Sequence, residues 1–230
     1  MNLHKARLYS ASRLSDLALT ELNIDNALIE RVGESQYQKT IAGRVYLVVE
    51  VQYAIFPSQL GSLTIPALRF SGYEVSGRTS FFNRGNRVIR TTEAHTVTVA
   101  ALPDGQPAAG WMPATEVTLE EQWSAAPDSL TVGEPITRTL TLTASGLTGA
   151  QLAPLPAADG DGFKSYPDQA KLSETSDSRG VVGQRIESTA IVPQQPGELT
   201  LPAITVNWWD TASDRPRRAT LPERTVTVAA

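Results

Sequence analysis

Residues able to carry out acid–base, nucleophilic or metal chemistry are scarce in this sequence. Cysteine is absent, which excludes thiol nucleophiles, disulfides and cysteine-ligated metals. The histidines are His4 and His95, and neither belongs to a motif such as His-Glu-x-x-His. We expect both to be strand-edge or surface histidines, because a catalytic triad or a two-histidine metal site needs suitable partners nearby in space. The sequence therefore predicts no catalytic residue, cofactor or metal.

Acidic residues offer two weaker alternatives. Asp159-Gly160-Asp161-Gly162 resembles the start of a calcium loop, in which oxygen ligands occupy alternate positions. Phe163 and Lys164 follow where further ligands are needed, so a glycine-rich turn is favoured. Two converging carboxylates would serve glycoside hydrolysis, but the sequence singles out no pair. A glycoside-active enzyme remains an alternative that requires a cleft.

Two basic segments are the strongest candidates for a binding surface. Residues 78–90 contain four arginines, two phenylalanines and no acid, and residues 214–218 form the corresponding segment of a second domain. Arginine and aromatic side chains are enriched at protein interfaces. The alternatives are solvated hairpins and contact with anionic lipid headgroups. The candidate contact residues in these segments are Phe81, Phe82, Arg84, Arg87, Arg90, Arg215, Arg217 and Arg218.

A tandem pair of tryptophans ends one apolar strand. Trp208 shares the parity of Ile204 and Val206, so we expect it to face the core and Trp209 to face outward. An outward tryptophan is a candidate binding hot spot or a platform for stacking a sugar ring. Trp209 therefore joins the candidate contact residues, with a structural role as the alternative.

The composition is that of a folded, acidic protein. Of the 230 residues, 41% are hydrophobic and 19% charged, which is typical of a chain that buries a core. The net charge of −4 argues against general electrostatic binding to nucleic acid. No stretch approaches the 18 apolar residues of a membrane-spanning helix.

An internal repeat indicates two copies of one domain. Residues 54–67 return 136 residues later as residues 190–203, with nine of fourteen positions identical. Each copy ends on the pentapeptide Val-Thr-Val-Ala-Ala, at residues 97–101 and 226–230. We predict a first domain over 1–101, a Pro/Gly linker over 102–116 in which Trp111 packs at the junction, and a second domain over 117–230.

The hydrophobic pattern predicts strands throughout. In residues 136–144 the even positions are mostly apolar and the odd positions are all threonine, and residues 45–55 place Glu50 and Gln52 opposite an apolar face. Short strands punctuated by Pro and Gly predict an all-β chain of two tandem immunoglobulin-like β-sandwich domains. The first copy has nothing to match residues 117–135, so we expect it to lack its N-terminal strand. We accordingly expect the sequence to be part of a longer protein.

Several runs resemble the BatD, or oxygen-tolerance, family of bacterial membrane-anchored proteins. They are residues 27–34, 53–57, 63–72, 111–114, 132–138 and 207–210. The resemblance implies a signal peptide, tandem β-sandwiches on the periplasmic side of the inner membrane, and a C-terminal transmembrane helix. It also implies von Willebrand A-domain proteins as partners and a link to oxygen or envelope stress. It implies no enzymatic activity and no catalytic residue.

The sequence thus predicts a non-catalytic protein-interaction module that belongs to an envelope complex. The alternative is a carbohydrate-binding β-sandwich, with peptidoglycan as the ligand, for which Trp209 would be the stacking residue.

Overall fold

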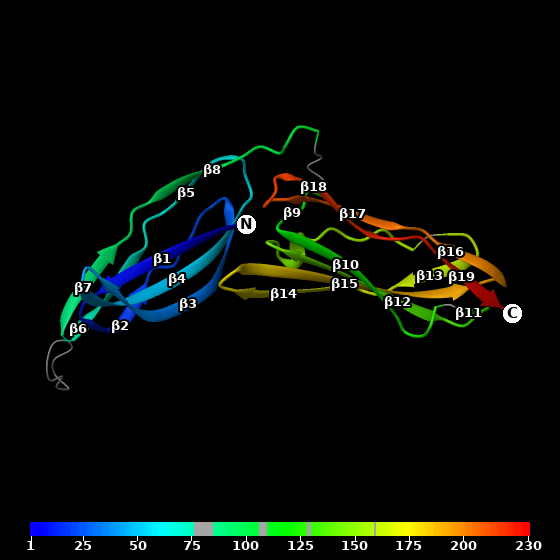
Figure 1. Cartoon of the computed structure of the whole chain (residues 1–230), viewed down its shortest axis with the longest axis horizontal. Helices are drawn as coiled ribbons and strands as arrows, with labels where there is room; N and C mark the ends of the chain where they lie inside the picture. The colour runs from blue at the N-terminus through cyan, green and yellow to red at the C-terminus, as the bar shows by residue number, and fades with distance from the viewer. Residues whose placement is uncertain (76–84, 106–109, 128–129, 159) are drawn as a thin grey trace. The chain divides into compact units, whose positions relative to one another are not determined.

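A computed structural model describes residues 1–75, 85–105, 110–127, 130–158 and 160–230 (Figure 1). The contacts divide the chain into two compact units, residues 1–104 with 177–180, and residues 105–176 with 181–230. Both units are built from strands, and the one helical element among the described residues is a 3₁₀ turn at Gly149–Gln151. The predicted all-β class is confirmed.

The first unit contains three small sheets around one core. Their strand orders are β1-β4-β3, β2-β6-β7 and β5-β8. A single cluster of buried side chains, including Ile55, Leu68 and Phe70, lies between them. The strands are β1 (Asn2–Ser10), β2 (Arg13–Leu19), β3 (Ala27–Ile41), β4 (Arg44–Pro57), β5 (Gly61–Ile65), β6 (Arg69–Val75), β7 (Asn86–Thr91) and β8 (His95–Val99).

The second unit repeats this plan with additional strands. Its sheets have the orders β10-β12-β15-β13, with β14 also beside β15, then β11-β19-β16 and β18-β17-β9. The strands are β9 (Pro113–Ala114), β10 (Glu116–Trp123), β11 (Leu130–Thr131), β12 (Ile136–Ser145), β13 (Phe163–Pro167), β14 (Lys171–Asp177), β15 (Gly180–Pro193), β16 (Gly197–Leu201), β17 (Ile204–Asp210), β18 (Arg215–Leu221) and β19 (Arg224–Ala229).

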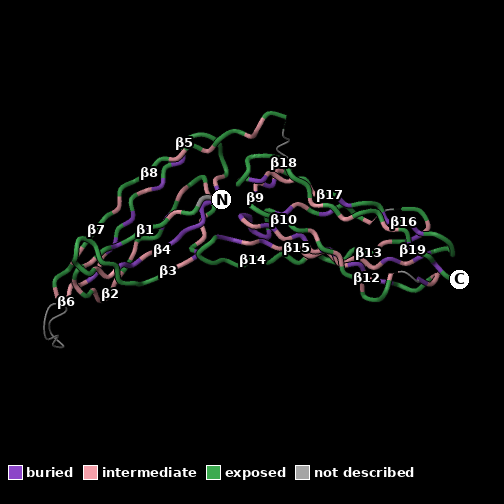
Figure 2. Tube along the Cα trace, in the orientation of Figure 1, coloured by how far each residue is buried: buried purple, intermediate pink, exposed green. Residues whose placement is uncertain are grey.

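Alternation along the strands produces the core of the second unit. In β12 every second residue is buried and the threonines between them are half-buried, as the period-two pattern predicts. Buried positions recur in this way along several strands in Figure 2.

Strand β4 of the first unit departs from the predicted pattern, because Gln52, which we expected on a solvent-exposed face, is only 3% exposed. Its Nε2 atom donates a hydrogen bond to the carbonyl oxygen of Ser178, a residue grouped with the first unit (2.8 Å).

The sequence repeat corresponds to a repeat of strand pairing. Residues 54–67 end β4 and form β5, and residues 190–203 end β15 and form β16. Strands β5 and β16 have the same burial pattern. β5 pairs with β8 as β16 pairs with β19. β6 and β7 form a hairpin as β17 and β18 do.

The two copies differ in length at their turns. Residues 76–85 connect β6 to β7, whereas residues 211–214 connect β17 to β18. The basic segments also contain the strands β7 and β18. Continuous antiparallel pairing with β6 and β17 makes each segment one arm of a hairpin.

An ion-pair network joins two sheets of the second unit. Glu121 of β10 lies 2.7 Å from Arg138 Nη2 of β12 and 3.3 Å from Arg224 Nη2 of β19. The Arg138 side chain is only 3% exposed, and its guanidinium lies 5.6 Å from the centre of the Trp123 ring. A buried guanidinium needs a counter-charge, because its desolvation is otherwise uncompensated. Glu121 supplies that charge.

The same network sets the ionisation of Glu121. Burial alone would raise the pKa of its carboxyl, but the Trp123 indole and the Arg138 and Arg224 guanidinium groups outweigh burial and hold that pKa below its usual value. The Trp123 Nε1 atom is buried and meets no acceptor at hydrogen-bond geometry. We therefore attribute the lowered pKa mainly to the two guanidinium groups.

We expect Glu121→Gln to destabilise the second unit by about 3 kcal/mol, because Arg138 keeps a buried charge without its partner. All four tryptophans of the chain lie in this unit, so denaturant unfolding followed by tryptophan fluorescence reports on it selectively. The exposed neighbour provides the matched control, and Glu120→Gln should leave the unfolding midpoint nearly unchanged. Equal midpoints for the two variants would contradict the role given to Glu121.

The stability supplied by Glu121 should also depend on pH. Its folded pKa is the lower one, so the unfolded state takes up the proton more readily. The contribution is complete above the ordinary glutamate pKa of 4.5 and is lost as the pH falls below it. We expect the gap in unfolding free energy between the wild type and Glu121→Gln to narrow from about pH 6 to about pH 3. A gap that stays constant over this range would contradict the assignment.

Candidate interaction surface

Two stacked tryptophans form the most distinctive surface feature of the second unit. The Trp111 and Trp209 ring centres are 5.6 Å apart, with their planes at 36°. Parallel pairing of β9 with β17 holds them there, and the Trp209 backbone N–H donates to the Met112 carbonyl oxygen (2.9 Å). Trp208 points to the opposite face and packs against the core cluster that contains Met112 and Ile204. Trp209 therefore points away from that core, but Trp111 stacks on it and it is half-buried.

The turn after Trp209 is organised by one carboxylate. Asp210 is 6% exposed and accepts hydrogen bonds from the Ala212 and Ser213 backbone N–H groups and from Ser213 Oγ. The Ser213 hydroxyl is the largest of several influences that lower the pKa of this carboxyl. Arg217 Nε lies 3.4 Å from Asp210 Oδ2. The hydrogen-bonding capacity of Asp210 is thus largely used in holding the turn.

A second aspartate completes this turn. Asp214 has a φ of +52°, in the left-handed region that short polar side chains tolerate. Its Oδ1 atom accepts a hydrogen bond from Trp209 Nε1 (3.1 Å), which fixes the orientation of the indole. Arg215 Nε donates to Ser213 Oγ (3.0 Å). Hydrogen bonds therefore hold this turn of the basic hairpin, while its residues 211–218 stay exposed.

An open groove of about 800 Å³ lies beside this hairpin. It is lined by Gly110, Trp111, Met112, Asn207, Trp208, Pro216, Arg217 and Arg218. Two indole rings, two guanidinium groups and one amide give it aromatic surface, positive charge and hydrogen-bonding groups. Arg217 is half-exposed, and Arg218, on the other face of β18, is exposed. Such a groove can bind a partner that combines a flat or apolar group with an anion or a carbonyl oxygen.

The predicted contact residues are divided between the units. Trp209, Arg215, Arg217 and Arg218 come together on the β17–β18 hairpin. Arg87 and Arg90 are exposed on β7 of the first unit, where Arg90 Nη1 donates to the Ile89 carbonyl oxygen (2.8 Å). Some predicted residues lie outside the described part of the chain. They are Phe81, Phe82 and Arg84 of the basic segment, and Asp159 of the calcium alternative.

The arginines of the two hairpins do not occupy equivalent positions. Arg87 lies opposite Tyr73, and the position equivalent to it, opposite Trp209, is Pro216. Arg90 lies opposite Phe70, and its counterpart is Ala219. The hairpins share a basic composition without sharing an arginine site. A common ligand site in both copies is not supported by this register.

The structure also brings together two residues that the sequence places far apart. The His4 and His95 rings are 6.2 Å apart between centres, with their planes at 57°. Their proximity follows from the pairing of β1 with β4 and of β8 with β5, which no local pattern specifies. Throughout the described ranges, no group of three or more His, Cys, Asp or Glu residues could hold a metal ion.

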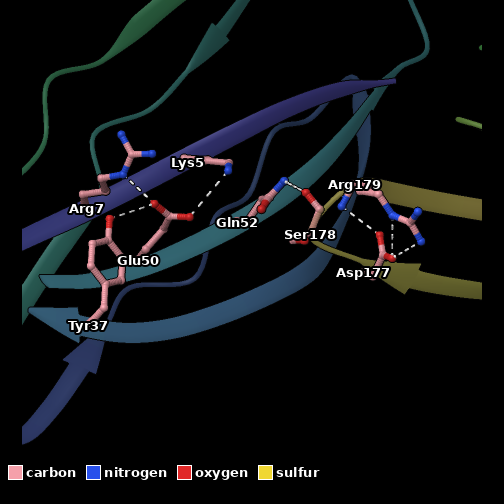
Figure 3. Close-up of polar contacts among 8 residues, drawn as sticks. All are labelled: Lys5, Arg7, Tyr37, Glu50, Gln52, Asp177, Ser178 and Arg179. Atoms are coloured by element: carbon pink, nitrogen blue, oxygen red, sulfur yellow. Dashed lines mark hydrogen bonds and ion pairs between the residues drawn. The ribbon is translucent and has the colours of Figure 1, made fainter.

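A charged cluster on the first unit was likewise not singled out from the sequence. Glu50 of β4 lies 2.5 Å from Arg7 Nε and 3.6 Å from Lys5 Nζ, both of β1, and accepts a long hydrogen bond from the Tyr37 hydroxyl (Figure 3). The bond from Arg7 is the main cause that lowers the pKa of Glu50. Arg7 is directly opposite Glu50 in register. The basic residues of β1 alternate along the strand and so lie on one face. This spacing could have predicted a cross-strand partner of opposite charge.

Part of the second unit is similar to a known protein family. Residues 123–221, from the end of β10 through β18, match the family model described as BatD DUF11 like domain. A search of curated proteins found no match. In the part of the chain that the structure describes, no helix has the length and apolarity needed to cross a membrane. The family match confirms the resemblance drawn from the sequence motifs: residues 123–221 are similar to the BatD domain.

Proposed function

We propose that this chain is a non-catalytic protein-interaction module of a membrane-anchored periplasmic protein. In this proposal it works in an envelope complex with von Willebrand A-domain proteins and contributes to tolerance of oxygen or envelope stress. The match of residues 123–221 to the domain of the BatD family, whose proteins are extracytoplasmic, supports the location. The observation that carries the binding role is the tryptophan–arginine groove beside the β17–β18 hairpin.

The groove has the composition and rigidity of a protein-binding site. Tryptophan and arginine dominate interface hot spots, because they combine a large contact area with directed hydrogen bonds. Trp111 of the groove packs against Trp209, and Arg217 is held near Asp210, so little side-chain freedom is lost on binding. Arg218 is exposed at the rim and is available to a partner carboxylate or carbonyl.

A non-catalytic role agrees with the chemistry of the same groove. The BatD domain is not a known catalytic family. Asp210, which lies beside the groove residue Arg217, already accepts hydrogen bonds from Ala212 and Ser213. General acid–base catalysis needs a carboxyl that is free to exchange a proton with a substrate. The groove is therefore better suited to recognition than to proton transfer.

We expect Arg218→Ala to weaken binding of a purified von Willebrand A-domain from the same organism by about tenfold or more, the effect of losing one hot-spot arginine. Calorimetric titration of the whole chain measures this change. Lys171→Ala removes an exposed positive charge from β14 as a matched control and should bind like the wild type. Equal losses for both variants would indicate general electrostatics, and no loss for Arg218→Ala would remove the groove from the interface.

The same titration should be run with magnesium and again with EDTA. An A-domain metal completed by a partner carboxylate would make binding magnesium-dependent. Binding mainly through the groove should persist in EDTA, because Trp111, Arg217 and Arg218 contribute no metal ligand. Failure to bind with and without the metal would contradict the proposed partner class.

A carbohydrate ligand is the second candidate, and the stacked indoles favour it. Trp111 is only half-buried, and an open aromatic face beside Asn207 can stack a sugar ring and bond its hydroxyls. Peptidoglycan fragments should then change tryptophan fluorescence in a saturable way, and Trp111→Leu should abolish the change. An unaltered spectrum across a glycan panel would exclude this ligand class.

A further inference from the structure

Each unit contains a hollow at the same place in the repeated fold. The hollow of the first unit has a volume of about 380 Å³ and is lined by residues 19–22, Ile29, Arg31 and Tyr53. The hollow of the second unit has a volume of about 180 Å³, and its lining includes residues 155–158, Ser165, Pro167 and Thr189. Every lining residue of the first hollow thus recurs 136 residues later, at the spacing of the sequence repeat. The hollow is therefore a feature of the fold that both copies share.

The strand pairings around the hollow are also the same in both units. Arg31 of β3 lies opposite Tyr53 of β4, as Pro167 of β13 lies opposite Thr189 of β15. In the second unit β10 pairs with β12, and none of its residues, all of which are described, lines the hollow. A strand in that position leaves the hollow open. By equivalence, the opening in the first unit does not depend on what lies beside β1.

The two hollows differ in size and in the groups that line them. The first has a carboxylate, a guanidinium and a phenol, which come from Glu21, Arg31 and Tyr53. The equivalent residues of the second unit are alanine, proline and threonine. Small-molecule sites have volumes of about 300 Å³ or more, which the first hollow reaches and the second does not. The first hollow is therefore the one suited to a polar ligand.

Tyr53 is the buried polar residue of this hollow. It is 6% exposed, and its hydroxyl makes no hydrogen bond with a described residue. Burial is the main cause that raises the pKa of this hydroxyl, so it stays protonated and can donate. Arg31 opposes the rise, while Glu34 and Glu21 add to it, which shows that these charges act on the hydroxyl.

Two oppositely charged side chains stand at the rim. Arg31 projects from the same face as Tyr53, because directly opposite residues of paired strands share a face. Glu34 lies 2.5 Å from Arg31 Nη2, and Nε and Nη1 of Arg31 have no partner among the described residues. Glu21 is exposed and forms no ion pair or hydrogen bond within the described ranges. A guanidinium and a hydroxyl thus lie together, and a carboxylate faces them from the segment after β2.

We propose that the hollow of the first unit binds a small aliphatic zwitterion of the amino-acid class. The ligand carboxylate accepts hydrogen bonds from the Arg31 guanidinium and the Tyr53 hydroxyl, and the ligand ammonium pairs with Glu21. The aliphatic side chain packs against the apolar part of the lining, which consists of Leu19, Leu22 and Ile29. The site belongs to the first unit, so this proposal does not depend on the function of the tryptophan–arginine groove.

Nuclear magnetic resonance of the methyl-labelled full chain measures this binding and locates it. L-leucine is the probe, with N-acetyl-leucine, which lacks the ammonium, and leucinamide, which lacks the carboxylate. We expect saturable shifts of the Leu19, Leu22 and Ile29 methyl signals at millimolar leucine, and binding about tenfold weaker for each blocked compound. Leu155 is equivalent to Leu19 in the second hollow and should not shift. Equal binding of the three compounds, or an equal shift of Leu155, would overturn the proposal.

Variants assign each group of the ligand to its partner. Tyr53→Phe keeps the ring and removes the hydroxyl, and Arg31→Gln removes the charge, so each should weaken leucine binding about tenfold. Glu21→Gln should weaken leucine binding but leave N-acetyl-leucine binding unchanged, because that compound has no ammonium. Arg13→Gln removes another exposed arginine, from β2, as a matched control and should bind like the wild type. Leucine binding that is unaffected by Arg31→Gln would contradict the site.

Three further outcomes would also reject a zwitterionic ligand. The absence of a saturable shift at tens of millimolar leucine would show that the hollow does not bind an amino acid. Tighter binding of leucinamide than of leucine would assign the hollow to cations. Tighter binding of N-acetyl-leucine than of leucine would assign it to anions.

Discussion

The burial of the Arg138 guanidinium is the constraint on which the second domain depends. A charge that is 97% covered is tolerated in a protein interior only with a counter-charge in contact, and Glu121 meets that need from the neighbouring strand. The same carboxylate reaches Arg224 on β19, in a different sheet. One acid thus specifies the register of β10 on β12 and joins two sheets, while Trp123 covers the guanidinium. An edge strand held in this way cannot slip by one residue without exposing its apolar side chains.

The proposed binding surface relies on comparable local order. The short strand β9 brings Trp111 against Trp209 by backbone pairing, and Asp210 and Asp214 hold the turn that follows. A partner can then contact the side chains that make no structural contact of this kind. They are chiefly the exposed Arg218 and the open face of Trp111. Recognition by prearranged side chains loses less conformational entropy than recognition by a flexible basic loop.

The strand pattern was predictable because alternation is a local property of the sequence. Residues 136–144 form β12 with the expected faces, and the repeat predicts equivalent pairing in both copies. What could not be predicted depends on long-range register or on pairing of irregular segments. The meeting of His4 with His95 needs two strand pairings at once, and the stacking of Trp111 on Trp209 needs a parallel pairing of a proline-rich segment. Gln52 showed that a polar residue in an alternating strand can be buried when a backbone acceptor reaches it.

The unequal turn lengths of the two hairpins show where this fold accepts extra sequence. Residues 76–85 replace the shorter connection of residues 211–214, yet the strands on both sides keep the same pairing partners. Length has therefore changed at this point without altering the alternation that builds either core. For protein engineering, the β6–β7 connection is a natural insertion point for an epitope, a fluorophore or a surface-attachment tag, because the sheets need not be redesigned to accommodate it.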